Sequence, residues 1–149
     1  MRSRLALLLL LALAVTAIAP SAASAGTAER KMLRAINSAR AANGVARVKA
    51  YTPLARTSER YAGFMLRYDV WAHAASPARG THMRYVGEIL GMTTTSGPAA
   101  RAVVAAWLAS PVHRAILLDG MYRYVGIGAR RGTMNGQTAW VWVVRFGAR

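Results

Sequence analysis

The sequence predicts an α+β fold, an α-β-α sandwich with a small antiparallel sheet between helices. Helical patterns fill most of the chain up to about residue 118, and strand-like patterns follow. The last strand carries an apolar run without alternation, Trp140-Val141-Trp142-Val143-Val144. A strand that is apolar on both sides is covered on both faces. Helices are therefore expected on both sides of the sheet.

The first 25 residues are typical of a cleaved secretory signal peptide. Arg2 and Arg4 precede an apolar stretch over residues 5–19, and Ala23-Ser24-Ala25 offers a small-x-small cleavage site. A retained membrane anchor is the alternative. A proline and two serines interrupt the run after residue 19, whereas a spanning helix needs roughly 20 predominantly apolar residues. We therefore expect cleavage after the small-x-small site and a single domain over residues 26–149.

Four helices are predicted from apolar stripes at helical spacing and from the residues that begin and end helices. They cover residues 28–42, 53–68, 98–109 and 112–118. Thr27, Thr52 and Ser110 are the expected N-caps of the first, second and fourth helices. Proline stands at the start of the last three helices, where its missing N–H group costs little. Asn43-Gly44 is expected to end the first helix.

Strands are predicted near the C-terminus, where the apolar pattern changes its period. Residues 122–129 and 139–146 form two strands, joined by a turn rich in Gly and polar residues at 131–137. A short strand over residues 86–90 is placed to pair with them. A loop rich in His, Ser, Pro and Gly, residues 72–81, separates the second helix from this strand.

The composition favours anionic partners. The chain carries 20 Lys and Arg against 5 Asp and Glu, a formal net charge of +15. Such an excess favours lipid or anionic envelope polymers. Nucleic acid is not expected, because the basic residues are scattered and no basic motif interleaved with aromatics occurs. A solvated Arg-rich surface without any partner is the alternative. The chain has no cysteine, so packing alone must stabilise the domain.

Three residues are candidates for a functional cleft: His73, Glu88 and His113. They come from the loop after the second helix, a probable strand and the first turn of the fourth helix. Glu88 near the interior needs a partner, because an unpaired buried charge is costly. Arg84, Arg114 or a cleft histidine is expected to supply it. The remaining histidine, His82, is expected at the surface.

Six short motifs in this order resemble the CAP superfamily, which comprises cysteine-rich secretory, antigen 5 and pathogenesis-related 1 proteins. Among its branches, the chain looks most like the small secreted bacterial one. The resemblance covers about residues 29–146, and the fourth motif is its most specific part. The motifs are Ile36-Asn37-Ser38-Ala39-Arg40, Trp71-Ala72-His73-Ala74-Ala75-Ser76-Pro77, Gly87-Glu88-Ile89, Trp107-Leu108-Ala109-Ser110-Pro111-Val112-His113-Arg114, Val125-Gly126-Ile127-Gly128 and Trp142-Val143-Val144-Arg145-Phe146-Gly147.

The resemblance implies an α-β-α sandwich with a cleft formed by two histidines and two acidic residues. By motif match these are His73, His113 and Glu88, with Ser110 where larger relatives carry the second acid. Ile89 also stands where the family has Asn, so the backbone-fixing hydrogen bonds of that Asn are lost. Two imidazoles and a carboxylate are suited to Zn²⁺ or a similar divalent ion. A purely structural Glu–His or Glu–Arg bond is the alternative.

The function expected from these features is that of a secreted, monomeric, non-enzymatic protein. Its cleft would bind a divalent metal or small ligand, and its basic surface would contact the cell envelope. An extracellular hydrolase that uses the same cleft is the alternative. However, the sequence contains neither the His-Glu-x-x-His motif of metallopeptidases nor the Gly-x-Ser-x-Gly motif of serine hydrolases. A basic envelope-binding module with a vestigial cleft is a third interpretation.

Overall fold

The computed structural model describes residues 22–149, so most of the predicted signal peptide lies outside the described residues. The first helix, α1, spans Ala22–Ala42. It therefore begins before the predicted cleavage site after Ala25. Thr27 lies inside the helix, and the prediction that it caps the helix is wrong. The small residues that precede it, mostly alanine, favour a continuous helix.

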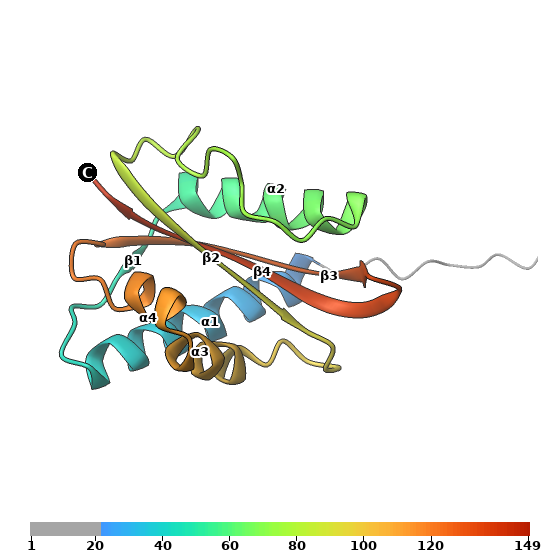
Figure 1. Cartoon of the computed structure of the whole chain (residues 1–149), viewed down its shortest axis with the longest axis horizontal. Coiled ribbons are helices and arrows are strands. Elements are labelled where there is room, and N and C mark those ends of the chain that lie inside the picture. Colours follow the sequence, from blue (N-terminus) through green and yellow to red (C-terminus); the bar gives the residue numbers. More distant parts are fainter. Residues whose placement is uncertain (1–21) are drawn as a thin grey trace, which may run out of the picture.

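A four-stranded sheet forms the middle layer of the molecule, with strand order β1-β3-β4-β2. The helix α2 covers one face, whereas α1, α3 and α4 cover the other (Figure 1). This arrangement confirms the predicted α-β-α sandwich. The other helices span Thr52–Tyr68 (α2), Ala100–Ala109 (α3) and Pro111–Leu117 (α4). The strands span Lys49–Ala50 (β1), Tyr85–Thr93 (β2), Tyr124–Met134 (β3) and Gln137–Ala148 (β4).

The central strand β4 is buried on both faces, as its apolar run predicts. Trp140, Trp142 and Val144 belong to a core cluster with residues of α1 and α3. Val141 and Val143 belong to a second cluster with α2 residues. Because side chains alternate along a strand, one uninterrupted apolar run supplies two cores. β2 and β3 pair with β4 in antiparallel fashion on either side, so the short strand predicted at residues 86–90 is confirmed.

Several element boundaries differ from the sequence prediction. The β3–β4 hairpin is longer than expected, because only Asn135-Gly136 forms its turn, and both residues adopt positive φ angles. Such a pair suits the tight turns that fit the twist of a hairpin. α2 begins one residue before the predicted start, so Tyr51, and not Thr52, occupies the N-cap position. α3 begins at Ala100, two residues later than predicted. The short strand β1, parallel to β3, was not predicted.

Arg40 anchors the end of α1 to the chain that leads into β3. Its side chain is completely buried. The guanidinium donates hydrogen bonds to the carbonyl oxygens of Ala46, Leu117, Asp119 and Tyr122, at 2.7–3.1 Å. Burial lowers the pKa of Arg40 from its usual range. The first motif of the sequence therefore contains a structural arginine, a role that the sequence pattern did not reveal.

Candidate functional site

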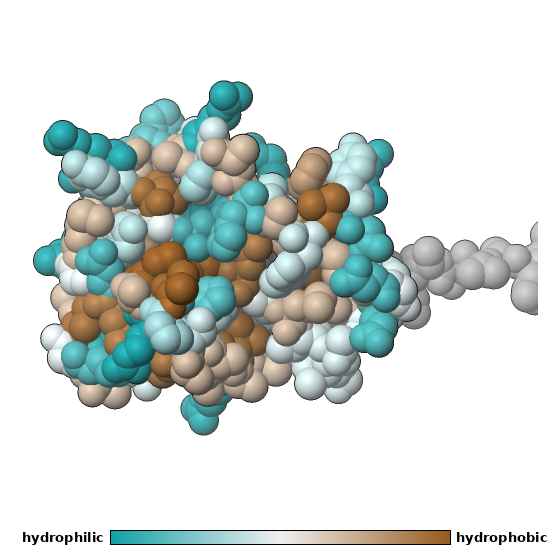
Figure 2. All heavy atoms as spheres, in the orientation of Figure 1, coloured by the Kyte–Doolittle hydropathy of each residue, from teal (hydrophilic) through white to brown (hydrophobic). Residues whose placement is uncertain are grey.

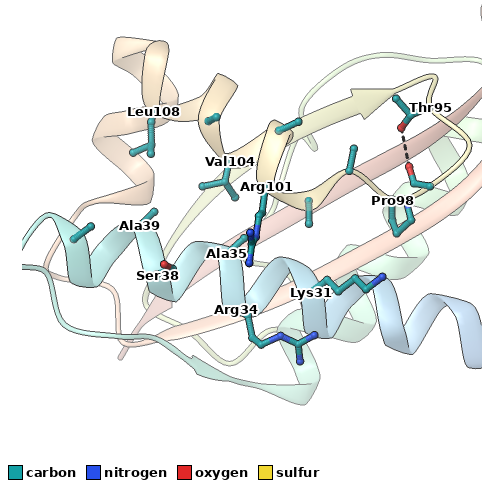
Figure 3. Close-up of a pocket in the computed structure, with 16 residues that line it drawn as sticks. Lys31, Arg34, Ala35, Ser38, Ala39, Thr95, Pro98, Arg101, Val104 and Leu108 are labelled. Carbon is teal, nitrogen blue, oxygen red and sulfur yellow. Dashed lines mark hydrogen bonds between the residues drawn. The ribbon is translucent and has the colours of Figure 1, made fainter.

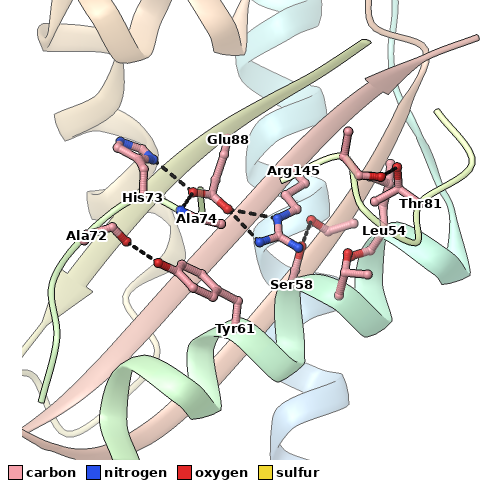
Figure 4. A network of polar contacts seen from close by, with 12 residues as sticks. Leu54, Ser58, Tyr61, Ala72, His73, Ala74, Thr81, Glu88 and Arg145 are labelled. Carbon is pink, nitrogen blue, oxygen red and sulfur yellow. Dashed lines mark hydrogen bonds and ion pairs between the residues drawn. The ribbon is translucent and has the colours of Figure 1, made fainter. Parts of the chain in front are cut away.

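Glu88 is a buried carboxylate on β2 that accepts hydrogen bonds at both oxygens (Figure 4). Its side chain is only 3% exposed. Oε1 accepts a hydrogen bond from the backbone N–H of Ala74 at 2.9 Å and lies 3.0 Å from Nδ1 of His73. Oε2 lies 2.9 Å from Nε and 2.8 Å from Nη2 of Arg145. These contacts offset the loss of hydration that burial imposes on a carboxylate.

Arg145 supplies the charge that Glu88 requires. It lies directly opposite Glu88 in the β2–β4 register, and its side chain is 5% exposed. The expectation that Arg84 or Arg114 pairs with Glu88 is wrong, whereas the expected bond to a cleft histidine is present. Arg145 was missed although the sequence contains a signal for it. It is the single charged residue in the predicted apolar strand 139–146, and a buried arginine itself needs an acidic partner.

Tyr61 of α2 completes this network. Its ring lies 5.4 Å from the guanidinium carbon of Arg145, and its hydroxyl donates to the carbonyl oxygen of Ala72 at 2.9 Å. Burial, followed by the negative charge of Glu88, raises the pKa of Tyr61. The phenol therefore stays protonated as a donor at neutral pH. The loop that carries His73 is thus held from two sides, by Tyr61 and by Glu88.

His73 lies at the rim of this network, with a side chain that is 59% exposed. An ionised carboxylate can only accept a hydrogen bond, so the bond to Glu88 assigns the proton to Nδ1 of His73. Nε2 then points to no partner within residues 22–149. His73 and Glu88, two of the three predicted cleft residues, are therefore brought together.

His113, the third predicted cleft residue, makes its contact outside the Glu88 network. Its Nδ1 lies 2.8 Å from Oγ of Ser110, the residue that directly precedes α4. Within residues 22–149, no hydrogen bond joins His113 to Glu88 or His73. Ser110 occupies the predicted N-cap position, but its side chain bonds His113 instead of capping the backbone. His82 is exposed, as predicted.

The three candidate metal ligands, His73, Glu88 and His113, do not form one group within the described residues. No group of three His, Cys, Asp or Glu side chains within residues 22–149 is placed to hold a metal ion. In addition, both oxygens of Glu88 are already bonded, one of them to a guanidinium. Ile89, the second departure from the family pattern, is completely buried in the core. β2 thus keeps its pairing with β4 through this position.

A groove of about 1270 Å³ lies on the opposite side of the sheet, between α1 and α3 (Figure 3). Small or aliphatic residues, including Ala35, Val104 and Leu108, form most of its walls. Three cationic side chains, Lys31, Arg34 and Arg101, line it as well, and no acidic residue does. Sequence reasoning did not identify this groove, because it depends on how two helices are spaced. Within residues 22–149, no helix is long and apolar enough to cross a membrane.

Comparison with known proteins places this geometry in a family. Residues 33–146 match the cysteine-rich secretory protein family, CAP. An outer surface protein of Borrelia burgdorferi has a similar fold, with a TM-score of 0.68 at 21% identity over 83% of this chain and 93% of that one. Schistosoma mansoni venom allergen-like protein 4 gives a TM-score of 0.65 at 10% identity, covering 81% and 88% of the two chains.

An extracellular protein of Bacillus anthracis that contains an SCP domain is similar as well. Its TM-score is 0.69 at 15% identity over 84% of this chain, which spans 41% of that longer protein. A search of curated protein sequences finds no match. At these identities the structural likenesses establish the fold, and the family match over most of the chain agrees with the six motifs. The chain therefore belongs to the cysteine-rich secretory protein (CAP) family.

Proposed function

We propose that this chain is an exported, non-enzymatic CAP domain that binds an amphiphile with an anionic head group. The observation that carries the proposal is the groove between α1 and α3, with its apolar walls and cationic residues. Its volume of about 1270 Å³ slightly exceeds the usual range for small-molecule sites. An acyl chain would lie against the apolar walls, and a carboxylate or phosphate would meet the cations.

The charges around the groove support an anionic head group. Lys31 and Arg34 lie on α1, and Arg101 lies on α3 (Figure 3). None of the three forms an ion pair within residues 22–149. Their positive charges therefore remain available to an incoming anion. The apolar part of the ligand would supply most of the affinity, because burial of apolar surface contributes roughly 25 cal/mol per Å².

Filling the groove is expected to weaken this binding strongly. Ala105 lines the groove and is exposed, so Ala105→Trp would occupy the ligand's space without disturbing the core. We expect binding of the fluorescent probe dansylamino-undecanoic acid to weaken at least about tenfold. Ala106→Trp is the matched control, because Ala106 is the next residue, is exposed and does not line the groove. Fluorescence titration with equal affinity for both variants would refute the groove as the site.

Export and envelope contact are part of the same proposal. The predicted signal peptide and the strong positive excess support a place outside the cytoplasm, near anionic envelope polymers. Two of the structurally similar proteins are described as an outer surface protein and an extracellular protein. Attachment to isolated envelope material should weaken steeply with salt, because such contacts are screened within a Debye length of about 10 Å at 0.1 M.

Zinc binding by His73 and His113 stays a prediction that needs its own test. Each ring uses Nδ1 for a contact within the protein, so Nε2 is the available ligand atom. We expect weak Zn²⁺ binding in calorimetry, lost in both His73→Ala and His113→Ala. His82→Ala is the control, because His82 is exposed and makes no contact with the Glu88 network. Equal heats for all four proteins would reject the metal site.

The geometry does not favour the alternative of a hydrolase. A serine nucleophile needs a histidine base that an acid in turn orients. His113 contacts Ser110, but no carboxylate within residues 22–149 bonds to His113. Glu88, the buried acid, is held by Arg145 and by the loop of His73. A binding role therefore accounts for the arrangement better than catalysis does.

A further inference from the structure

The C-terminal half of α2 and the residues that directly follow it carry a cluster of exposed hydrophobic side chains. Eight large hydrophobic side chains are exposed within residues 22–149, and four of them fall between residues 64 and 71. They are Phe64 (45%), Tyr68 (59%), Val70 (38%) and Trp71 (45%). We name these four residues the aromatic patch. In Figure 2, hydrophobic surface is visible over the right-hand, C-terminal end of α2, surrounded by hydrophilic atoms.

The patch is held in place by contacts within the protein. Phe64 and Tyr68 are one helical turn apart, and their rings lie 4.8 Å apart. Phe64 also stacks on Tyr61 at 5.7 Å. Because Tyr61 bonds the carbonyl of Ala72, the backbone beside Trp71 is fixed against the same flank of the helix. Side chains exposed in a fixed arrangement lose little conformational entropy when a partner covers them.

Arginines surround the aromatic patch. Arg60, Arg67 and Arg79 are all exposed, and none of them pairs with an acid within residues 22–149. Arg60 and Arg79 also line a shallow pocket of about 400 Å³, which Phe64 borders. One acid lies close in sequence, Asp69, and its Oδ1 accepts a hydrogen bond from the backbone N–H of Asn135. Aromatic side chains beside unpaired arginines are typical of surfaces that rest in a membrane interface.

We propose that this face of α2 docks onto a bilayer that contains anionic phospholipids. The aromatic patch enters the interface between head groups and acyl chains, and Arg60, Arg67 and Arg79 meet lipid phosphates. Charge complementarity selects this partner, because the protein carries 20 Lys and Arg against 5 Asp and Glu. The docking face lies across the sheet from the α1–α3 groove (Figure 1), so membrane contact leaves the proposed ligand site open.

Vesicles test this proposal with the protein that remains after the expected cleavage, residues 26–149, which contain every residue of both core clusters. We expect sedimentation with vesicles of equal phosphatidylglycerol and phosphatidylcholine, and little with phosphatidylcholine alone. Trp71 is the single exposed tryptophan, since Trp107, Trp140 and Trp142 are at most 6% exposed. Docking should therefore shift its fluorescence to shorter wavelength.

Substitutions distinguish vesicle binding through the docking face from attraction by the overall positive charge of the protein. Phe64→Ser and Trp71→Ser should each weaken partitioning onto the anionic vesicles roughly tenfold. Val112→Ser is the matched control, because Val112 is 72% exposed on α4 and lies outside the patch. Arg60→Gln combined with Arg79→Gln should weaken partitioning about tenfold as well. The control pair is Arg47→Gln combined with Arg114→Gln, two exposed arginines that line neither the α1–α3 groove nor the pocket beside the aromatic patch.

Three results would overturn the proposal. The first is partitioning that Phe64→Ser and Trp71→Ser leave unchanged. The second is loss of partitioning to the same degree in Val112→Ser or in the control arginine pair. The third is a dimer in sedimentation velocity without vesicles that Phe64→Ser dissociates, because the patch would then be an interface between two copies. Ala105→Trp should keep full vesicle binding, so failure of the groove proposal and failure of this one are distinguishable.

Discussion

Arg145→Met is expected to lower the free energy of unfolding by about 3–5 kcal/mol. The substitution removes the guanidinium and leaves Glu88 as a buried carboxylate with a side chain only 3% exposed. The remaining contacts from His73 and the backbone of Ala74 reach Oε1, whereas Oε2 loses both of its contacts with the guanidinium. Urea denaturation followed by tryptophan fluorescence measures the loss.

A double variant identifies the cause. In Glu88→Gln combined with Arg145→Met, the buried charge is absent, and the side-chain amide oxygen can still accept from Ala74. We therefore expect the double variant to regain a substantial part of the stability that Arg145→Met loses. His73→Ala should cost less than about 1 kcal/mol, because that side chain is 59% exposed and water can replace its bond. A double variant no more stable than Arg145→Met would show that lost packing of the arginine side chain is the cause instead.

These outcomes bear on how the cleft motifs should be interpreted in this chain. The six motifs identified His73 and Glu88, and the structure joins them. The sequence also implied that Glu88 needs a partner. Arg145, the single charge in the apolar strand 139–146, was a candidate that the sequence offered, but only the register between β2 and β4 places it opposite Glu88. His113 illustrates the opposite case. Its motif is the most specific of the six, yet the side chain bonds Ser110, the N-cap residue of its own helix, and not Glu88.

The overall layers of the fold were more predictable than its local boundaries. Because β4 is apolar on both faces, helices must pack on both sides of the sheet, wherever those helices begin and end. The turn was harder to place, because Arg130 and Arg131 give the end of β3 a polar composition typical of a loop. Instead, the hairpin continues past them to Asn135-Gly136. The α1–α3 groove and the aromatic patch both depend on spacing in three dimensions, which no single motif encodes.

Gly126→Ala is expected to destabilise the domain by at least about 3 kcal/mol, because α2 lies directly on β3 at this position. A Cβ atom at Gly126 would lie 2.1 Å from the carbonyl carbon of Leu54 and 2.2 Å from the backbone nitrogen of Ala55. Both are backbone atoms of α2, so no side-chain rotation relieves the contact. Gly128 meets the backbone of Ser58 and Glu59 in the same way, at 2.4 Å.

Gly63→Ala is the matched control for this prediction. Gly63 lies inside α2, and a Cβ atom there would meet nothing within 4 Å. Because glycine disfavours a helix interior, this substitution should raise the stability by about 0.5–1 kcal/mol. Thermal unfolding followed by circular dichroism compares the two variants. If Gly126→Ala melts within a few degrees of the unmodified protein, the close contact between α2 and β3 is absent in solution. In that case, the position of Tyr61 over Arg145, which depends on the same contact, would have to be revised as well.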